Sequence, residues 1–406
     1  MWTMTSARRI SSSLLALAAA LLAPGAHADV LHIPADFPTL DEAAEVAQPG
    51  DVILFASGTY HDPVAATDLH DVTIRGQGLV IFAGGLVGTP ALELVNCTNV
   101  TVEHLRVTDA PDVGVEVSGS GVTLSHVRVE TAAILAIHGV LADSLLDHCV
   151  VQGPGNNGII LDDSDHVTIS RCTVKGTLNV GIGLSQTEDC LVDRCHVTDG
   201  GVYAIGLGIS LPSSGCQVRK CVVGGVNDVG LYVLGGDNLL LDNRVKDVGG
   251  PGIELDFGST GGLVQHNRLI GCAEGIITRA ANPLLRDDRI VKSLFEGIFC
   301  EGPGAVLVDE RVLHAGFHAF SIDPTMVGGS FTGCKAVHPV SNGYEVGGSQ
   351  LTFTGNTSVG TGQVGFHVTG TDNLFVGNTA KGSGTIGLDD EVGGNTYLDN
   401  DFGVLN

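Results

Sequence analysis

The sequence predicts an all-β solenoid in which short parallel strands from successive coils stack along a rod. Three observations carry this prediction. First, the chain repeats itself with a period of about 22–23 residues. Second, each repeat contains short runs of alternating apolar and polar residues, separated by Gly, Asn, Asp and Ser, which is typical of strands and turns. Third, 58 of the 406 residues are Gly, and each Gly inside a helix costs roughly 1 kcal/mol relative to Ala.

Two columns of equivalent residues define the repeat. Because one repeat cannot bury its own apolar face, about fourteen coils must stack to form a continuous core. We expect the Asn residues to form a ladder along one turn. The first column holds small residues at Ala91, Gly114, Ala136, Gly158, Gly181, Gly206, Gly230, Gly252, Gly275, Gly297, Ala319, Gly343, Gly365 and Gly387. The second holds Leu105, Val127, Cys149, Cys172, Cys195, Cys221, Asn243, Asn267, Asp288, Glu310, Cys334, Asn356, Asn378 and Asn400.

The first 28 residues have the pattern of a signal peptide. Arg8 and Arg9 precede an apolar run over residues 14–22, and Ala26-His27-Ala28 forms a small-residue cleavage site. The apolar run is far shorter than the ~20 residues of a membrane span, and no other run in the sequence is long enough. We therefore expect a secreted or periplasmic protein without a membrane span.

Residues 29–69 are expected to form an N-terminal cap and the first strand, and residues 70–406 the solenoid. Thr39 and Glu42 fit a capping box that starts a short helix extending to Gln48. We predict the first strand at residues 52–55 and its turn at residues 58–60. No cap is evident after Asn400, so an open last coil would expose strand edges and favour self-association.

The repeat lines carry a family resemblance. One line, NGIILDDSDHVTISRCTVKGTL, spans residues 157–178, and comparable lines start at Val229 and Val364. They resemble the right-handed parallel β-helix superfamily, the pectin-lyase-like fold, across essentially all of residues 70–406. The resemblance implies this fold and an activity on polysaccharides, which is common in the superfamily. The opening PTLDEAAEVAQPGDVILFASGTY is similar to that of bacterial secreted β-helix proteins, including the periplasmic accessory protein of nitrous-oxide reductase maturation.

Charge and cysteine usage narrow the possible partners. The formal net charge is −25, which argues against nucleic acid, because phosphate backbones are bound by clustered Lys and Arg. The sequence has ten cysteines, and an exported protein can form disulfides because its compartment is oxidising. Cys149, Cys172, Cys195 and Cys221 nevertheless share the Asn column, so we favour a stack of buried thiols.

Outward positions of the strands form a stripe of carboxylates. In a strand of the form Gly-apolar-x-apolar-x, the x side chains point to solvent. The predicted catalytic residues, which should lie about 5 Å apart along the rod, are Asp256, Arg279, Glu301 and Asp323. A carboxylate pair suits acid–base chemistry, and Arg279 can hold a substrate carboxylate. The predicted substrate-binding residues are Glu254, Phe299 and Tyr232. The coil lengths vary little, so we expect this face to be shallow.

A second acidic cluster is similar to part of the pectate-lyase calcium motif. It contains Asp147 and His148, followed by Asp162, Asp163, Asp165 and His166. Asn157 stands where the family has the first Asp of its second calcium motif, and Asp162 is shifted by one position. Generic turn and ladder residues explain the cluster better. Ca²⁺ is a possible cofactor here or at the stripe, and the sequence assigns no cofactor beyond this possibility.

Three functions remain open on the sequence. The first is a lyase, hydrolase or epimerase that acts on an extracellular polysaccharide. The second is a non-catalytic binding or structural solenoid; the single Trp, Trp2, lies in the signal segment, which removes the strongest sugar-stacking residue. The third is a periplasmic metal-centre accessory protein, although the scattered His and the single Met after residue 28, Met326, are not the clustered soft ligands of a copper carrier.

Overall fold

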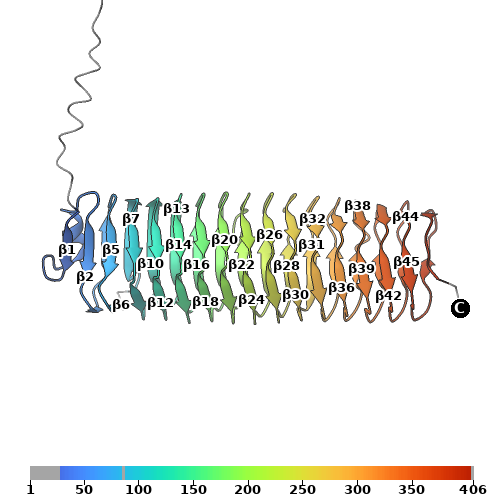
Figure 1. The fold of residues 1–406 in the computed structure, drawn as a ribbon, viewed down its shortest axis with the longest axis horizontal. Helices are drawn as coiled ribbons and strands as arrows, with labels where there is room; N and C mark the ends of the chain where they lie inside the picture. The colour runs from blue at the N-terminus through green and yellow to red at the C-terminus, as the bar shows by residue number, and fades with distance from the viewer. Residues whose placement is uncertain (1–27, 85–86, 404–406) are drawn as a thin grey trace, which may run out of the picture.

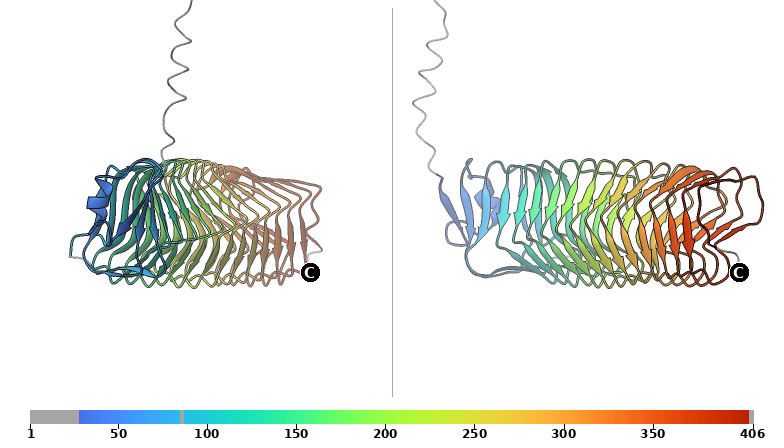
Figure 2. Two further views of the ribbon diagram at one scale, coloured as in Figure 1. Left: turned by 60° about the vertical axis from the view of Figure 1, so that its left-hand side comes forward. Right: turned by 45° about the vertical axis from the view of Figure 1, so that its right-hand side comes forward.

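The computed structural model describes residues 28–84 and 87–403. The predicted signal segment therefore lies almost entirely outside the described residues. The chain forms a straight rod of stacked coils, with the described N-terminal residues at one end and the C-terminal ones at the other (Figure 1). Two further views show the coils wrapping around one continuous interior (Figure 2). None of the helices in the described part of the chain is long and apolar enough to span a bilayer.

The coils build three parallel sheets, which we call A, B and C, and every coil except those at the two ends contributes one strand to each. Along the chain the strands follow the order C, A, B. Sheet A consists of β1 (Val30–Ile33), β2 (Val52–Phe55), β5 (Thr73–Gly76), β8 (Thr101–Glu103), β11 (Thr123–Ser125), β14 (Leu145–Asp147), β17 (Thr168–Ser170), β20 (Leu191–Asp193), β23 (Gln217–Arg219), β26 (Leu239–Leu241), β29 (Leu263–Gln265), β32 (Leu284–Arg286), β35 (Val306–Val308), β38 (Val327–Thr332), β41 (Ser349–Thr354), β44 (Leu374–Val376) and β47 (Thr396–Leu398).

Sheet B consists of β3 (Gly58–Tyr60), β6 (Val80–Ala83), β9 (Arg106–Thr108), β12 (Arg128–Glu130), β15 (Val150–Gln152), β18 (Thr173–Lys175), β21 (His196–Thr198), β24 (Val222–Gly224), β27 (Arg244–Lys246), β30 (Arg268–Ile270), β33 (Arg289–Val291), β36 (Arg311–Leu313), β39 (Lys335–Val337), β42 (Thr357–Val359) and β45 (Thr379–Lys381). Sheet C consists of β4 (Val64–Thr67), β7 (Leu92–Thr98), β10 (Val113–Ser120), β13 (Leu135–Ala142), β16 (Asn157–Asp162), β19 (Val180–Ser185), β22 (Tyr203–Leu207), β25 (Val229–Val233), β28 (Pro251–Leu255), β31 (Glu274–Thr278), β34 (Ile298–Cys300), β37 (Phe320–Ile322), β40 (Tyr344–Val346), β43 (Phe366–Val368) and β46 (Leu388–Asp390).

The alternation of apolar and polar residues places one side chain of each pair in the interior. In sheet C, Ile253, Ile276 and Ile298 are in register and fully buried. Toward the C-terminal coils aromatic side chains take over this position. Tyr344 stacks on Phe320 and on Phe366, with ring centroids 4.7 and 4.4 Å apart. The interior is therefore a dry core, and functional side chains must lie on the outside.

The turns explain why so many polar residues recur at fixed spacing. At the corner between sheets A and B, successive coils place a residue with positive φ, such as His148 (φ 52°), Asp242 (φ 57°) or Asp309 (φ 57°). The next coil has Gly333 (φ 66°) there. Asn, Asp and Gly adopt this left-handed conformation at the least cost. Most Asp residues at the corners are thus explained by backbone geometry.

The predicted Asn ladder is present. Asn356 accepts a hydrogen bond from the Cys334 amide (2.9 Å) and donates its own amide hydrogens to the Phe331 carbonyl (2.8 Å) and to Asn378 (3.0 Å). Where the column holds Cys, the thiol takes over the donor role: Cys195 Sγ lies 3.5 Å from the Ile169 carbonyl oxygen. All ten cysteines are buried free thiols, in agreement with the stack that the column predicts.

Several details of the sequence prediction were wrong. The structure has about 17 coils, as the 17 strands of sheet A show, because residues 30–83 already form coils whose spacing is too irregular to match the repeat. Residues 52–55 are the second strand, paired with β1, and residues 58–60 are strand β3, not a turn. The capping helix α2 (Leu40–Ala44) begins at the predicted N-cap Thr39 but ends before Gln48.

The register of the small-residue column also needs one correction. Gly206 pairs with Gly183 and with Tyr232, so it points outward. Ala204 occupies the predicted position beside Gly181, where a Cβ on Gly181 would lie 2.5 Å from the Ala204 carbonyl oxygen. The extra residues of this coil therefore follow β22, in the loop over residues 208–213.

Candidate functional site

The predicted stripe lies on the outer face of sheet C, in two adjacent columns. Glu254 pairs in register with Tyr232 on one side and Ile277 on the other, and Ile277 pairs with Phe299. The second column lies just beyond the strand ends. Its backbone amides bond to the preceding coil, from Arg279 to Leu255 (2.8 Å), from Glu301 to Thr278 (2.9 Å) and from Asp323 to Cys300 (2.9 Å). Asp256 occupies the same position one coil before Arg279.

Arg279 lies at the centre of the face. Its Nε donates to Glu301 Oε2 at 3.0 Å, and its Nη1 donates to Glu254. The guanidinium also covers the ring of Phe257, with Cζ 5.5 Å from the centroid. Arg279 is thus held between two carboxylates from the neighbouring coils, so the Nε and Nη1 donors of its guanidinium are already paired in the free protein.

Burial and pairing shift the pKa values of this group in identifiable directions. Burial disfavours the charged form of Arg279, but Glu254 and Glu301 outweigh it and raise the pKa of the guanidinium. Burial also raises the pKa of Glu254, and the attraction of Arg279 offsets this only in part. Glu254 is therefore suited to carry a proton, whereas Arg279 is a poor base.

Tyr232 links the second carboxylate to the face. Its phenol donates to Asp256 Oδ2 at 2.7 Å, and burial together with this bond raises the pKa of Tyr232. Its ring lies against that of Tyr203 from the preceding coil, with centroids 4.6 Å apart. The two tyrosines and Asp256 thus form one continuous group over three coils, joined by a hydrogen bond and by a tilted ring contact.

Of the other predicted residues, Asp323 is separate from this group. Its carboxylate accepts from the Thr325 amide (2.8 Å) and hydroxyl (2.6 Å) in its own turn. Phe299 is half-buried on the same face. The structure thus brings Glu254, Arg279 and Glu301 together, places Asp256 with Tyr232 beside them, and leaves Asp323 at the edge.

On the coils before the stripe, the outer face of sheet C has a wall on one side, which sequence reasoning missed. Ile209, in the loop after β22, folds back over the outward-facing Gly183 and Gly206. A Cβ on Gly206 would lie 2.3 Å from Ile209 Cγ2, so only Gly allows this approach. The loop borders a hollow of about 480 Å³ whose lining includes Ile160, Asp162 and Tyr203. The signal was the longer interval between Cys195 and Cys221.

The second acidic cluster is divided among three places. Asp147, at the end of β14, accepts bonds from His148 (2.8 Å) and Arg171 (3.0 Å). Asp162 contacts His138 at 3.1 Å on the outer face of sheet C. Asp165 contacts His166 at the corner that follows. These carboxylates do not converge on one point, so the partial calcium motif does not form a cage of oxygen ligands.

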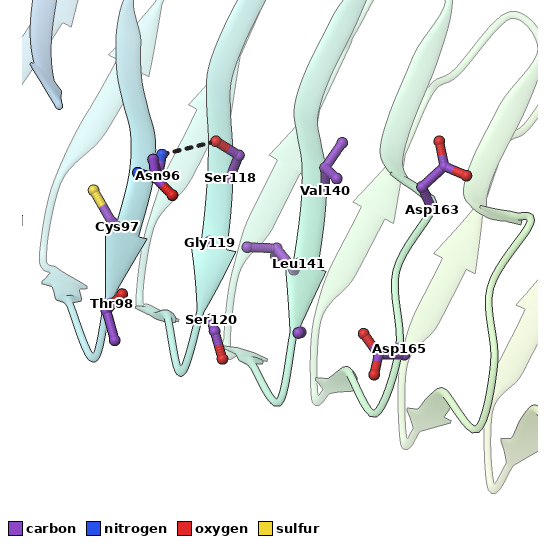
Figure 3. A pocket seen from close by; sticks show the side chains of 11 residues that line it. Asn96, Cys97, Thr98, Ser118, Gly119, Ser120, Val140, Leu141, Asp163 and Asp165 are labelled. Atoms are coloured by element: carbon purple, nitrogen blue, oxygen red, sulfur yellow. Dashed lines mark hydrogen bonds between the residues drawn. The ribbon is translucent and has the colours of Figure 1, made fainter. Parts of the chain in front are cut away.

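A shallow hollow of about 390 Å³ lies at the corner between sheets C and A, lined by Val140, Leu141, Asp163 and Asp165 among others. Figure 3 shows Asp163 and Asp165 at one end of it, on the same coil but pointing in different directions. The Asn96 amide donates to Ser118 Oγ at 3.0 Å within it. It follows the ladder and turn pattern of the neighbouring coils and carries no convergent set of reactive groups among its lining residues.

The chain belongs to the family described as "Right handed beta helix region", which matches residues 90–211 and 207–402. No curated protein sequence matches it. Solved structures with a similar fold include enzymes that act on polysaccharides. A GH87 α-1,3-glucanase catalytic domain, bound to tetrasaccharides, has a TM-score of 0.55 at 12% identity, over 75% of this chain and 68% of that one.

Two further structures are similar over most of their length. A mannuronic acid specific polysaccharide family 6 lyase from human gut microbiota has a TM-score of 0.53 at 14% identity, over 87% of both chains. The A-module of the Azotobacter vinelandii mannuronan C-5 epimerase AlgE6 has a TM-score of 0.51 at 13% identity, over 90% of this chain and 93% of that one. At such low identity the likeness establishes the fold, while the site must be argued from its own residues.

Proposed function

We propose that this exported protein acts on an extracellular polysaccharide, which lies along the outer face of sheet C from Asp162 to Glu301. The observation that carries the proposal is the arrangement around Arg279: two carboxylates from neighbouring coils beside the Tyr232–Asp256 pair, next to a hollow walled by the loop over residues 208–213. Tyr203, which is half-buried, offers an apolar ring edge to a sugar, Tyr232 lies largely buried beside it, and the carboxyls supply acid and base. The glucanase, lyase and epimerase folds support the substrate class.

Each group has a role that follows from its surroundings. Glu254, whose pKa is raised by burial, is the proposed general acid. Asp256 is the proposed base or nucleophile, oriented by Tyr232. Arg279 positions Glu254 and Glu301. A substrate group that displaces one of these carboxylates would accept the hydrogen bonds that the Arg279 guanidinium then has free.

The charge of the face favours one reaction over the others. Glu254 and Glu301 flank Arg279, and Asp256 and Asp323 add two further carboxylates to the same face, in a chain with a net charge of −25. Such a surface repels polyuronates unless a cation bridges them. Hydrolysis of a neutral glycan therefore fits the face better than elimination or epimerisation of a uronate.

A second candidate function is non-catalytic binding of the same glycan. It is favoured by the internal pairing of the face, because Arg279, Asp256 and Asp323 all have partners within the chain. A role as a copper accessory protein has less support: Met326 and all ten cysteines are buried, so these soft ligands are not presented at the surface.

The test is a screen of neutral and acidic polysaccharides, with and without Ca²⁺, that measures reducing ends and unsaturated products alongside retardation in glycan-containing gels. The proposal expects new reducing ends from a neutral glycan. Retardation without products would favour the binding solenoid. Neither products nor retardation with any glycan would contradict both.

A further inference from the structure

Near the C-terminal end of the outer face of sheet C, three potential metal ligands come together. His367 is the middle residue of β43 and pairs in register with Asp389 of β46; Glu391 follows two residues later. One ligand atom from each of these three side chains lies within 4.8 Å of the other two. This group lies apart from the Glu254–Glu301 face and is independent of the proposed function.

The orientation of the His367 ring is fixed from behind. Nδ1 lies 2.9 Å from both carboxylate oxygens of Glu345, on the preceding coil. Glu345 is itself held by the side-chain amide of Asn342, at 2.7 Å. A carboxylate that accepts the Nδ1 hydrogen leaves Nε2 as the metal-binding nitrogen, and metal-ligating histidines are commonly supported in this way.

The front of the ring then faces an acceptor. Nε2 of His367 lies 3.1 Å from Glu391 Oε1. When Nδ1 carries the ring hydrogen and donates it to Glu345, Nε2 and Glu391 Oε1 both present lone pairs, so one metal ion can bind the two atoms together. Ligands bound at 2.0–2.2 Å to a tetrahedral ion lie roughly 3.4 Å apart, which is close to the 3.1 Å between His367 Nε2 and Glu391 Oε1, and the ligand atom of Asp389 lies within 4.8 Å of both.

We propose that His367, Asp389 and Glu391 bind one divalent transition-metal ion such as Zn²⁺, with Glu345 as the positioning residue. One imidazole and two carboxylates suit Zn²⁺ or Co²⁺, whereas Ca²⁺ takes six to eight oxygen ligands. Glu391 is exposed, its side chain retaining 58% of its accessible surface, so the ion enters from solvent. A fourth ligand position remains for water or a substrate oxygen.

The chain contains a matched control for this site. His138, on the same face of sheet C, lies between Glu116 (3.5 Å) of the preceding coil and Asp162 (3.1 Å) of the following one. These carboxylates occupy the positions of Glu345 and Glu391. In place of Asp389, however, the residue in register with His138 is Ile160. His138 therefore has the flanking carboxylates without the third ligand.

The experiment is Zn²⁺ titration of the untagged, folded chain by calorimetry, with Co²⁺ absorption as a second readout. We expect one tight ion per chain with tetrahedral Co²⁺ bands, not displaced by millimolar Ca²⁺. His367→Ala and Asp389→Ala should each weaken binding by at least 10–100-fold, with unchanged circular dichroism, while His138→Ala has no effect. Absence of saturable binding, or equal loss in His138→Ala, overturns the proposal, as does binding that survives both ligand substitutions.

Discussion

The phenol of Tyr232 donates a 2.7 Å hydrogen bond to Asp256, a residue of the next coil that is 24 positions away in sequence. This bond joins the carboxylate to the stacked rings of Tyr232 and Tyr203. It makes Asp256 part of a preorganised group in which the oxygen not bonded to Tyr232 accepts the Phe257 amide at 2.7 Å. In the proposed function, this pair is the place where a sugar ring meets a carboxylate.

Removal of the phenol should separate its functional role from its structural one. Tyr232→Phe keeps the ring stack but leaves Asp256 without its side-chain donor. Because water can reach this carboxylate, we expect the free energy of unfolding to change by about 1 kcal/mol or less. Turnover of the glycan should fall by roughly 10–100-fold. Urea unfolding and initial rates measure the two effects; a rate equal to that of the unmodified protein would exclude Asp256 orientation as a role of Tyr232.

Substitutions in the Arg279 ion pairs should lower the free energy of unfolding by different amounts. Arg279→Met leaves Glu254, whose side chain keeps only 16% of its accessible surface, without a cation, so we expect a loss of about 1–3 kcal/mol. Glu301→Ala removes a less buried partner and should cost about 0.5–1 kcal/mol. Chemical unfolding of both variants compares the two, and a larger loss for Glu301→Ala would contradict this account.

Two acids inside the Asn ladder predict how stability depends on pH. Asp288 and Glu310 are fully buried, and Asp288 Oδ2 and Glu310 Oε2 have no hydrogen-bond partner. Burial raises the pKa of Asp288 to about 7, and also raises that of Glu310. The folded state thus binds more protons than the unfolded state between about pH 4 and 7, so stability is greatest below this range and falls as the pH rises through it.

Asp288→Asn should remove part of this dependence. An amide can make the bonds that Asn267 makes in the preceding coil, where Nδ2 donates to the Leu240 carbonyl at 2.9 Å. We expect the variant to be more stable than the unmodified protein by roughly 1–3 kcal/mol at pH 8 and by much less at pH 4.5. Urea midpoints at both values test this. An equal gain at the two pH values would show that Asp288 does not titrate in this range.

In the regular part of the ladder, removal of an Asn side chain should lower the free energy of unfolding, in contrast to the gain expected for Asp288→Asn. Asn356→Ala leaves the Cys334 amide and the Phe331 carbonyl without their side-chain partners. A buried polar group that loses its partner costs about 1–3 kcal/mol. We expect a total loss of about 2–4 kcal/mol in thermal or chemical unfolding. A loss below 0.5 kcal/mol would mean that the ladder contributes little to the stacking of the coils.

Much of the fold could be predicted from the sequence, because each coil repeats one pattern and a residue's column fixes its neighbours. The Asn and Cys column and the order of Asp256, Arg279, Glu301 and Asp323 followed directly from this. The register at Gly206 was wrong because two outward glycines, Gly183 and Gly206, imitate the inward small residues. The loop over residues 208–213, in which Ile209 covers these two glycines, was missed for the same reason.

The contacts within the site depend on features that the repeat does not encode. Column order indicates that Arg279 lies beside Glu301, but not that Glu254 also binds it or that Asp323 turns toward Thr325. These choices depend on rotamers and on local turns. Tyr203 had no motif of its own, and its role becomes visible only through its 4.6 Å stack with Tyr232.

The most direct test of the central claim, that the protein cleaves a glycan on this face, is the rate of the proposed cleavage when the carboxyls of the face are altered. We would compare the unmodified chain with Glu254→Gln, Asp256→Asn and the control Asp163→Asn, whose side chain lies in the hollow at the corner between sheets C and A, four coils before Asp256. The account predicts that kcat falls by about 100-fold or more for the first two, as is usual for a catalytic acid or base, and stays unchanged for the control. Full activity in both Glu254→Gln and Asp256→Asn would contradict it.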